Sequence, residues 1–347
     1  MHKAISLLLG LVIFSFTLTS VLIVPFINLL YKFKLQKRQQ KTKDAFDKPT
    51  PIFDRFHRHK AGIPVGGGFL IVLLVSSLFA LLFPFLKRLG LFVTANFSIN
   101  SEINILFFSF ISFSLLGLYD DLMKFFKVEK RGFFGLRLRH KFAIQWILAI
   151  TTSLMIFLNL KIGIFYIPFC GILKLGWLFV PFSSFVIVFF ANAVNISDGL
   201  DGLAAGVLLI CLFAFWILSA SILDTPLSLF IALWIGAIIA FLYFNIYPAR
   251  LMMGDVGSMA FGATLAVVGI LLGKIMALLV IGGVFVLEFM SSFLQLGYKK
   301  FFKKKLFAVA PFHLWLQLKG WEESKIVNRA WLASLMLAIF GLWLAIV

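Results

Sequence analysis

Residues Asn192 to Gly206 read NAVNISDGLDGLAAG and join two apolar runs, Trp177 to Ala191 and Leu203 to Leu218. The segment places two carboxylates, Asp198 and Asp201, beside glycines in an otherwise apolar sequence. A charged side chain at a membrane boundary is costly to desolvate, so it persists where it contacts a metal ion, a cation or a polar substrate. The segment therefore predicts both a loop between two membrane-spanning helices and part of a functional site.

The composition indicates a membrane protein, because 62% of the residues are hydrophobic and only 13% are charged. Soluble proteins have about one half and one quarter of these classes. Ten apolar runs can cross the roughly 30 Å hydrocarbon core of a bilayer: Ala4–Tyr31, Val65–Phe85, Ile103–Tyr119, Phe142–Leu158, Trp177–Ala191, Leu203–Leu218, Leu227–Phe244, Ser258–Leu272, Ile275–Phe293 and Arg329–Val347. We expect an all-α, polytopic integral membrane protein of ten transmembrane helices, with residues 1–347 forming a single domain.

The net charge of +18 is concentrated in alternate loops, which argues against nucleic-acid binding. The first loop (Lys32–Lys60) carries ten lysines and arginines, and the third (Asp120–Lys141) and ninth (Lys299–Lys325) carry seven each. The second and fourth loops carry two each, and the sixth carries none. The positive-inside rule then makes the odd loops cytoplasmic and places both termini outside. Anionic lipid headgroups and anionic substrates are the partners that such a surface favours.

Two further features of the chain bear on its outer side. The segment from Asn159 to Gly176 is broken by glycine and proline, which predicts a short external hairpin. The two cysteines, Cys170 and Cys211, fall in separate segments and predict neither a disulfide framework nor a metal site.

The polar motifs all fall in odd loops, so they are expected to converge on the cytoplasmic face. They are Lys60–Gly68, the pair Asp120 and Asp121, the pair Asp198 and Asp201, Asn245–Ser258 and His313–Trp321. Taken singly, each has a simpler explanation as a helix cap, a turn, a packing glycine or an interfacial histidine. Their shared face instead favours Mg²⁺ and diphosphate chemistry, in which carboxylates bind the cation, lysines hold phosphate charge and glycines allow close approach of the main chain.

Together the motifs resemble those of the polyprenyl-phosphate N-acetylhexosamine-1-phosphate transferase superfamily, glycosyltransferase family 4. The resemblance is carried by NAVNISDGLDGLAAG and by MGDVGSMAFG, which begins at Met253. Ala310-Pro311-Phe312-His313 and the segment from Leu318 to Val327 resemble the phospho-N-acetylmuramoyl-pentapeptide branch. Members have ten transmembrane helices and move a phospho-sugar from a UDP-sugar to undecaprenyl phosphate with Mg²⁺, releasing UMP. The resemblance thus implies UDP-N-acetylmuramoyl-pentapeptide and undecaprenyl phosphate as substrates, formation of lipid I for peptidoglycan, a bacterial cytoplasmic-membrane location and a homodimer.

Carried over by motif, the resemblance implies catalytic roles for Asp120 and Asp121 and magnesium binding by Asp255. Asp198 matches a position for contacts to uridine or to the metal. The implied substrate-binding residues are Lys60, Lys141, Asn192, Asn195, Asp198, Asp201, Asn245 and His313. The motifs leave open which of Asp120 and Asp121 accepts a proton, and whether transfer takes one step or passes through an acyl phosphate.

The chain departs from the family pattern in two places. Lys60-Ala-Gly is followed by Ile63-Pro64-Val65, where the family has threonines around the proline, and the family's histidine triplet is His313-Leu314-Trp315. The second change leaves open a sister transferase that loads another N-acetylhexosamine phosphate for a surface polysaccharide. Two other classes fit less well. A transporter would carry more polar residues in the membrane core, and a partner without activity would have lost its acids before its histidines.

Overall fold

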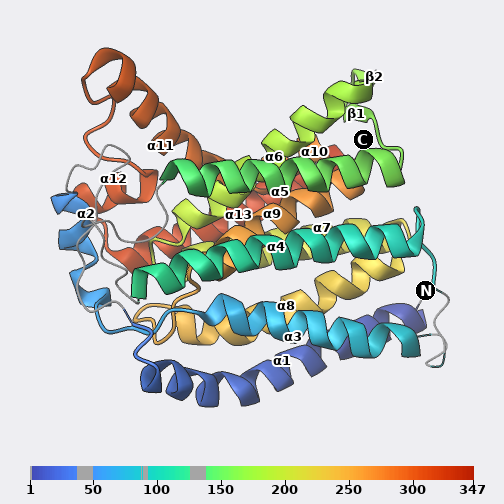
Figure 1. Cartoon of the computed structure of the whole chain (residues 1–347), viewed down its shortest axis with the longest axis horizontal. Coiled ribbons are helices and arrows are strands. Elements are labelled where there is room, and N and C mark those ends of the chain that lie inside the picture. The colour runs from blue at the N-terminus through green and yellow to red at the C-terminus, as the bar shows by residue number, and fades with distance from the viewer. Residues whose placement is uncertain (1, 37–49, 87, 89–92, 126–137) are drawn as a thin grey trace.

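The computed structural model describes residues 2–36, 50–86, 88, 93–125 and 138–347. Its long helices run side by side and form a bundle (Figure 1). They are α1 (His2–Lys32), α3 (Gly67–Leu82), α4 (Ile99–Phe125), α5 (Leu138–Asn159), α6 (Phe179–Ser197), α7 (Leu203–Ser221), α8 (Thr225–Asn245), α9 (Asp255–Leu271), α11 (Gly283–Phe302) and α13 (Glu323–Ile346). The expected all-α membrane architecture is confirmed.

Each of the ten predicted spans is helical, but two differ from a simple crossing. Eight described helices have the length and apolar composition of a span. Helix α9 has 17 residues, or about 25 Å at 1.5 Å per residue, slightly less than the core of a bilayer. The run predicted as one helix from Ile275 to Phe293 is instead α10 (Ile275–Ile281) followed by α11, with an 81° bend between them. The prediction of one continuous helix was wrong, because α10 ends at Ile281 and α11 begins in a new direction at Gly283.

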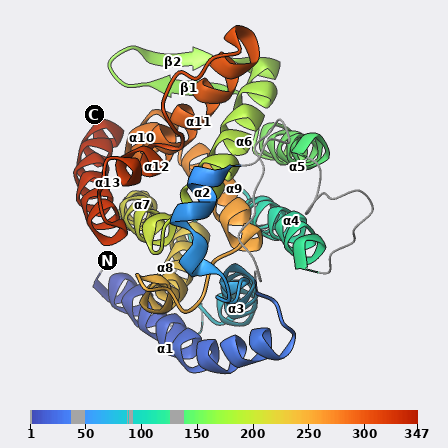
Figure 2. The same cartoon turned by 90° about the vertical axis from the view of Figure 1, so that its left-hand side faces the viewer.

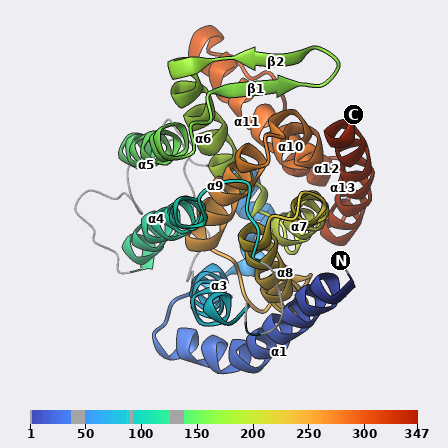
Figure 3. The same cartoon turned by 90° about the vertical axis from the view of Figure 1, so that its right-hand side faces the viewer.

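Helix α9 occupies the centre of the bundle, surrounded by other helices when viewed along its axis (Figures 2 and 3). Small residues make this possible, since they let helix backbones approach closely. A Cβ added at Gly117 of α4 would overlap the carbonyl of Asp255, and one added at Gly262 would overlap the carbonyl of Phe190. The N-terminus of α9, which carries Asp255, is therefore held by direct backbone contact with α4.

The two ends of the bundle differ. Both termini and a hairpin of β1 (Ile164–Ile167) and β2 (Gly171–Lys174) lie at one end (Figure 1), which confirms the predicted hairpin. Cys170 is exposed on it, Cys211 is buried, and both are free. Short helices lie at the other end, namely α2 (Pro51–Phe56), η1 (Arg58–Lys60) and α12 (Phe312–Leu318). The remaining short turns are η2 (Phe83–Phe85) and η3 (Gly176–Leu178).

Two of the predicted polar loops pair through their main chains at the end that carries α2 and α12. Val65 forms a parallel bridge with Met252, and the amides of Gly66 and Gly67 both donate to the Met252 carbonyl. Gly66 has a φ of 133°, a conformation that side chains disfavour. The start of α3 is thus tied to the segment before α9. Residues 37–49 and 126–137, which carry much of the basic charge of the first and third predicted loops, lie outside the described residues.

Candidate active site

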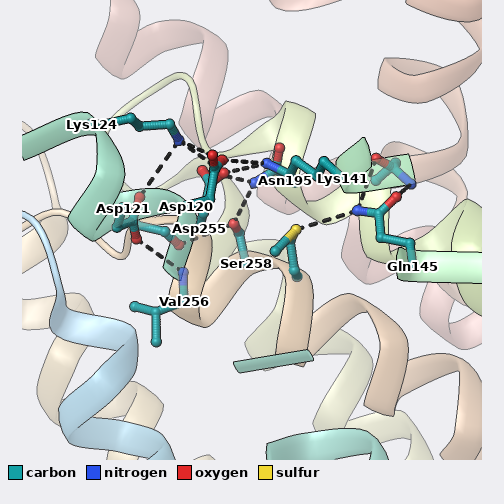
Figure 4. Close-up of polar contacts among 12 residues, drawn as sticks. Asp120, Asp121, Lys124, Lys141, Gln145, Asn195, Asp255, Val256 and Ser258 are labelled. Carbon is teal, nitrogen blue, oxygen red and sulfur yellow. Dashed lines mark hydrogen bonds and ion pairs between the residues drawn. The ribbon is translucent and has the colours of Figure 1, made fainter. Parts of the chain in front are cut away.

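The C-terminal end of α4 and the start of α9 bring two carboxylates onto the same lysines (Figure 4). Asp120 and Asp255 contact the Nζ atom of Lys124 at 3.0 and 2.9 Å. Lys141, near the start of α5, contacts Asp120 at 2.9 Å and also contacts Asp255. Lys124 lies one turn after Asp120, a spacing that lets the two side chains meet. Two acids and two ammonium groups therefore share one small polar site.

Asp121 points to a different partner from its neighbour. Its Oδ2 atom accepts a hydrogen bond from the amide of Val256 at 3.1 Å, so it caps the N-terminus of α9, where negative charge is favourable. Its other oxygen lies 3.6 Å from Lys124. Asp121 thus fixes the position of α9, while Asp120 faces the lysines.

A line of amides extends the site along α6. Asn195 donates to Asp255 at 3.2 Å and to the Ser258 hydroxyl at 2.8 Å. One turn earlier, Asn192 donates to Gln145 of α5 at 2.9 Å. Asn195 therefore belongs to the acid cluster, whereas Asn192 is paired with a neighbouring helix.

Asp198 follows the last residue of α6 and is half-buried. Burial, reinforced by the nearby charge of Asp255, raises the pKa of Asp198 well above its usual value, although Lys60 and the amide of Gly254 oppose the shift. Asp198 consequently holds its proton more tightly than an exposed carboxylate does.

A second cluster of charged side chains, Lys60, Asp201 and Glu323, is buried next to Gly199. Lys60 contacts the Gly199 carbonyl at 2.9 Å, Asp201 at 2.7 Å and Glu323 at 2.6 Å. The second oxygen of Asp201 accepts from the amide of Ala249 at 2.9 Å. These contacts join η1, the loop after α6, the loop after α8 and the start of α13.

Asn245 ties the same loops together. Its oxygen accepts from the Gly202 amide at 3.2 Å, and its nitrogen donates to the Leu251 carbonyl at 2.9 Å. Asn245 is buried, and both ends of its amide serve the main chain of this protein.

Two histidines approach Gly199 from opposite elements. His313 of α12 is bonded through Nδ1 to Glu288 of α11 at 2.9 Å, and its Nε2 atom has no hydrogen-bond partner among the described residues. A Cβ added at Gly199 would lie 2.7 Å from that Nε2 atom. His57 lies 2.8 Å from the Gly199 carbonyl. Burial, and then the charge of Lys60, lower the pKa of His57 to about 4 despite two carbonyl partners.

The donor set at Asp120 and Asp255 suits a hard divalent cation. Oxygen atoms of both carboxylates contact the same two cations, the ammonium groups of Lys124 and Lys141. In the described part of the chain, no three acidic, histidine or cysteine side chains form a ready coordination shell. Two carboxylates that already share cations fit Mg²⁺ bound together with a diphosphate, because Mg²⁺ uses few protein ligands and completes its shell with phosphate oxygens and water.

Comparison with known proteins places the chain in a family. The model for glycosyl transferase family 4 matches residues 103–273. A phospho-N-acetylmuramoyl-pentapeptide-transferase from Bartonella quintana is 35% identical over 82% of this chain and 80% of its own length. Relatives of that name from Desulfotalea psychrophila and Staphylococcus epidermidis are 36% and 35% identical and are matched over 80% and 87% of their lengths. The chain belongs to the phospho-N-acetylmuramoyl-pentapeptide-transferase family.

The site shows how the altered histidine motif of this family member is accommodated. Leu314 is buried, and Trp315 stacks on Phe312 at 5.7 Å between ring centres. Lys319 lies over the Trp315 ring. Leu314 is thus a packing residue of α12 and Trp315 contacts other side chains of the same segment, whereas His313 pairs with Glu288.

The site residues expected from the family motifs form one connected region. Asp120, Asp255, Lys141 and Asn195 form one set of contacts, and Asp198 is near enough to Asp255 for that charge to act on it. Lys60, Asp201 and Asn245 connect η1, the loop after α6 and the loop after α8. Asn192 lies one turn before Asn195 on α6 and pairs with Gln145.

The motifs did not identify four residues that the structure adds to this region: His57, Lys124, Glu288 and Glu323. Glu288, a rare acid inside an apolar run, carried the clearest signal in the sequence. Lys124 resembled part of a solvated helix face, and Glu323 resembled an ordinary acid at a helix start.

Proposed function

We propose that the chain transfers phospho-N-acetylmuramoyl-pentapeptide from its UDP derivative to undecaprenyl phosphate, forming lipid I and releasing UMP. The names of relatives matched over most of their length support this substrate pair. The single structural observation that carries the chemistry is the convergence of Asp120 and Asp255 on Lys124 and Lys141. An acidic site that also holds two ammonium groups suits transfer between two phosphates.

The site lies, in this proposal, on the cytoplasmic side of a bacterial inner membrane, where the UDP-sugar is available. The support is the density of lysine and arginine in the loops at that end. Helices α2 and α12 lie at the same end, opposite both termini (Figures 1 and 2). The hairpin and the termini would then face outward.

In the reaction, an oxygen of undecaprenyl phosphate forms a bond to the β-phosphorus of the UDP-sugar, and the bond from that phosphorus to the UMP oxygen breaks. Lys124 and Lys141 are placed to hold the diphosphate charge. The attacking phosphate is largely ionised at neutral pH, so it needs no strong base. Asp120, which faces the lysines, is better placed than Asp121 to accept any residual proton, because Asp121 is committed to the Val256 amide.

Magnesium forms part of the proposal. Asp120 and Asp255 would hold it, with Asp198 close by. When bound, the ion would neutralise the charge that develops on the phosphate oxygens. The half-exposed Lys124 side chain would be free to turn from the acids toward the diphosphate.

The test is turnover by the purified full-length protein with undecaprenyl phosphate, Mg²⁺ and a panel of UDP-sugars, followed by UMP release and by isolation of the lipid product. We expect product with UDP-N-acetylmuramoyl-pentapeptide. Product only with another UDP-N-acetylhexosamine would support the sister transferase and refute the muramoyl assignment. Release of UMP without a lipid product would refute transfer itself.

A further inference from the structure

Two carboxyl groups, those of Glu102 and Asp224, are buried together at the end of the bundle opposite the acid cluster. Glu102 lies in the first turn of α4, Asp224 directly precedes α8, and α4 begins at the end that carries both termini (Figure 1). Each carboxyl lies within hydrogen-bond reach of the other. Their exposed fractions are 0% and 2%, and acids are seldom buried to this extent unless they are paired.

Hydrogen-bond donors reach Asp224 but not Glu102. Asp224 caps α8, since its Oδ1 atom accepts from the amide of Leu227 at 3.2 Å, and the backbone amide of Asn96 donates to it as well. In the part of the chain that the structure describes, no N–H or O–H group donates to either oxygen of Glu102. An ionised carboxylate can only accept hydrogen bonds, and burying one without donors is very costly. The contact between the two acids therefore lacks a hydrogen.

The helices around the pair supply no charge that could compensate two carboxylates. The helices packed against α4 and α8 have no acidic, basic or histidine residue over the ranges 4–31, 67–82, 142–159, 203–221 and 256–271. The connecting segment 93–98 has none either, and Arg88, which precedes it, lies over the Phe85 ring. Two carboxylates that share a site without a cation oppose each other's ionisation, so that the pKa of one is raised. Burial also raises the pKa of Asp224, although its hydrogen bonds oppose the shift.

The pair is enclosed on two sides. Further along both helices, Phe107 and Phe110 of α4 contact Phe230 of α8 at 5.6 and 5.2 Å between ring centres. At the surface, the amide of Thr225 donates to the carbonyl of Thr94 at 2.8 Å. The two acids thus lie between a layer of aromatic rings and a hydrogen-bonded loop, which keeps the site poorly solvated.

We propose that Glu102 and Asp224 form a proton-binding site in which one shared proton joins the start of α4 to the start of α8. The proton makes an O–H···O hydrogen bond between the two carboxyls and leaves the pair with a single negative charge. That charge lies at the N-terminus of α8, where it is favourable. In the topology proposed above, the site faces the outer side of the membrane. The inference does not depend on the transferase activity.

This contact between α4 and α8 should weaken as the pH rises. An exposed carboxyl has a pKa of about 4, so both acids ionise and release the proton to water when the contact opens. The closed pair keeps one proton, and the open state binds one fewer. Each pH unit therefore disfavours the closed state by about tenfold while the closed pair remains protonated. The stability that the proton contributes is complete below about pH 4 and is lost progressively above it.

Hydrogen exchange of the first turns of α4 and α8, corrected for the intrinsic pH dependence of exchange, tests the site in the purified full-length protein. Between about pH 5.5 and pH 7.5, protection in the parent should fall about 100-fold. In Glu102→Gln and in Asp224→Asn it should change by less than about twofold, because an amide donates to the remaining carboxylate without titrating. Asparagine also preserves the helix cap.

The exposed Glu322 provides the matched control, and Glu322→Gln should keep the pH dependence of the parent. The same pH dependence in the parent and in Glu102→Gln would overturn the proposal. Loss of the dependence in only one of the two variants, Glu102→Gln or Asp224→Asn, would assign it to a single buried acid and would overturn the shared proton.

Infrared spectroscopy detects the proton itself. At neutral pH the parent should show a carbonyl stretch of an un-ionised carboxylic acid that both Glu102→Gln and Asp224→Asn remove. If neither variant removes such a band, or if protection at fixed pH depends on added Ca²⁺ or on a chelator, a proton does not join the pair and the proposal fails. Neither measurement requires transfer of a sugar phosphate, so failure of the proposed function would leave this test intact.

Discussion

Asp120 and Asp121 are adjacent in the chain and have separate tasks in the structure. Asp120 shares Lys124 and Lys141 with Asp255, whereas Asp121 accepts from the first amide of α9 after Asp255. Successive residues of a helix point in directions about 100° apart, which follows from 3.6 residues per turn. An acidic pair at a helix end can therefore serve one ligand and one neighbouring helix at once.

Asp255→Asn should reduce turnover by a factor of about 10²–10³, the usual cost of removing one group that stabilises transition-state charge. The amide keeps the size of the side chain but cannot neutralise a cation. UMP release measured across a Mg²⁺ titration tests this, with Glu322→Gln as the matched loss of one acidic charge at the same end of the bundle. Full activity of Asp255→Asn at limiting Mg²⁺ would remove Asp255 from the site.

Docking of η1 on the loop after α6 should weaken in acid. Burial, and then the charge of Lys60, lower the pKa of His57 from 6.5 to about 4. When η1 moves away from the loop after α6, the pKa of His57 returns to 6.5. Protonation of His57 therefore favours the displaced state as the pH falls from 6.5 toward 4, and docking is strongest above this window. At pH 5 the weakening is about 2 kcal/mol relative to pH 7.5.

Hydrogen exchange of residues 51–60, corrected for the intrinsic pH dependence of exchange, measures this effect. It should become faster at pH 5 in the parent protein. His57→Gln cannot titrate, so its protection should not change with pH over the same range. Equal pH dependence in both proteins would show that another group controls the loop.

The length of an apolar run predicts that it crosses the membrane, but it does not predict whether the crossing is one straight helix. Runs such as Leu227–Phe244 were predicted from the sequence because a bilayer demands about 20 apolar residues with satisfied backbone groups. The bend after Ile281 was missed because α10 and α11 are together apolar enough for one span. The paired glycines at 282 and 283 were the only local signal, and glycine pairs also occur in helices that remain straight.

The candidate site was predictable to a similar extent. Asp120, Asp198 and Asp255 interrupt apolar sequence with charge, so each could be located from the chain alone. Glu323 and Lys124 could not, because acids and lysines at helix ends usually face water. Their roles depend on which helices become neighbours, and that is decided by long-range packing.

Gly117→Ala should separate α4 from α9 and impair the site without changing any charged residue. The new Cβ would overlap the Asp255 carbonyl, and overpacking of this kind costs about 1–3 kcal/mol. We expect a lower melting temperature and at least a tenfold loss of kcat. Gly10→Ala is the matched control, since nothing lies within 4 Å of a Cβ added there on α1. Normal activity in Gly117→Ala would mean that the acid cluster tolerates movement of α9.

The distribution of charge and the arrangement of helices agree on which parts of the chain share a face. Ten helical segments, counting the bent pair α10 and α11 as one, bring the chain back to the end at which it started, and Figure 3 shows the hairpin and both termini at that end. The acid cluster and the loop after α6 lie at the opposite end. A bilayer placed across the bundle would therefore separate Cys170 from every proposed site residue.

Labelling with a membrane-impermeant maleimide tests this arrangement in living cells or spheroplasts. Cys170 is exposed and Cys211 is buried, so the parent protein should be labelled from outside at Cys170. In a Cys170→Ser background, Lys174→Cys should restore labelling from outside. Lys305→Cys, at an exposed position after α11, should react only after lysis. Between residues 174 and 305 the chain crosses the bundle five times, through α6, α7, α8, α9 and the bent pair α10–α11. Labelling of Lys174→Cys and Lys305→Cys from the same side would contradict this odd number of crossings, and with it the assignment of the acid cluster to the cytoplasm.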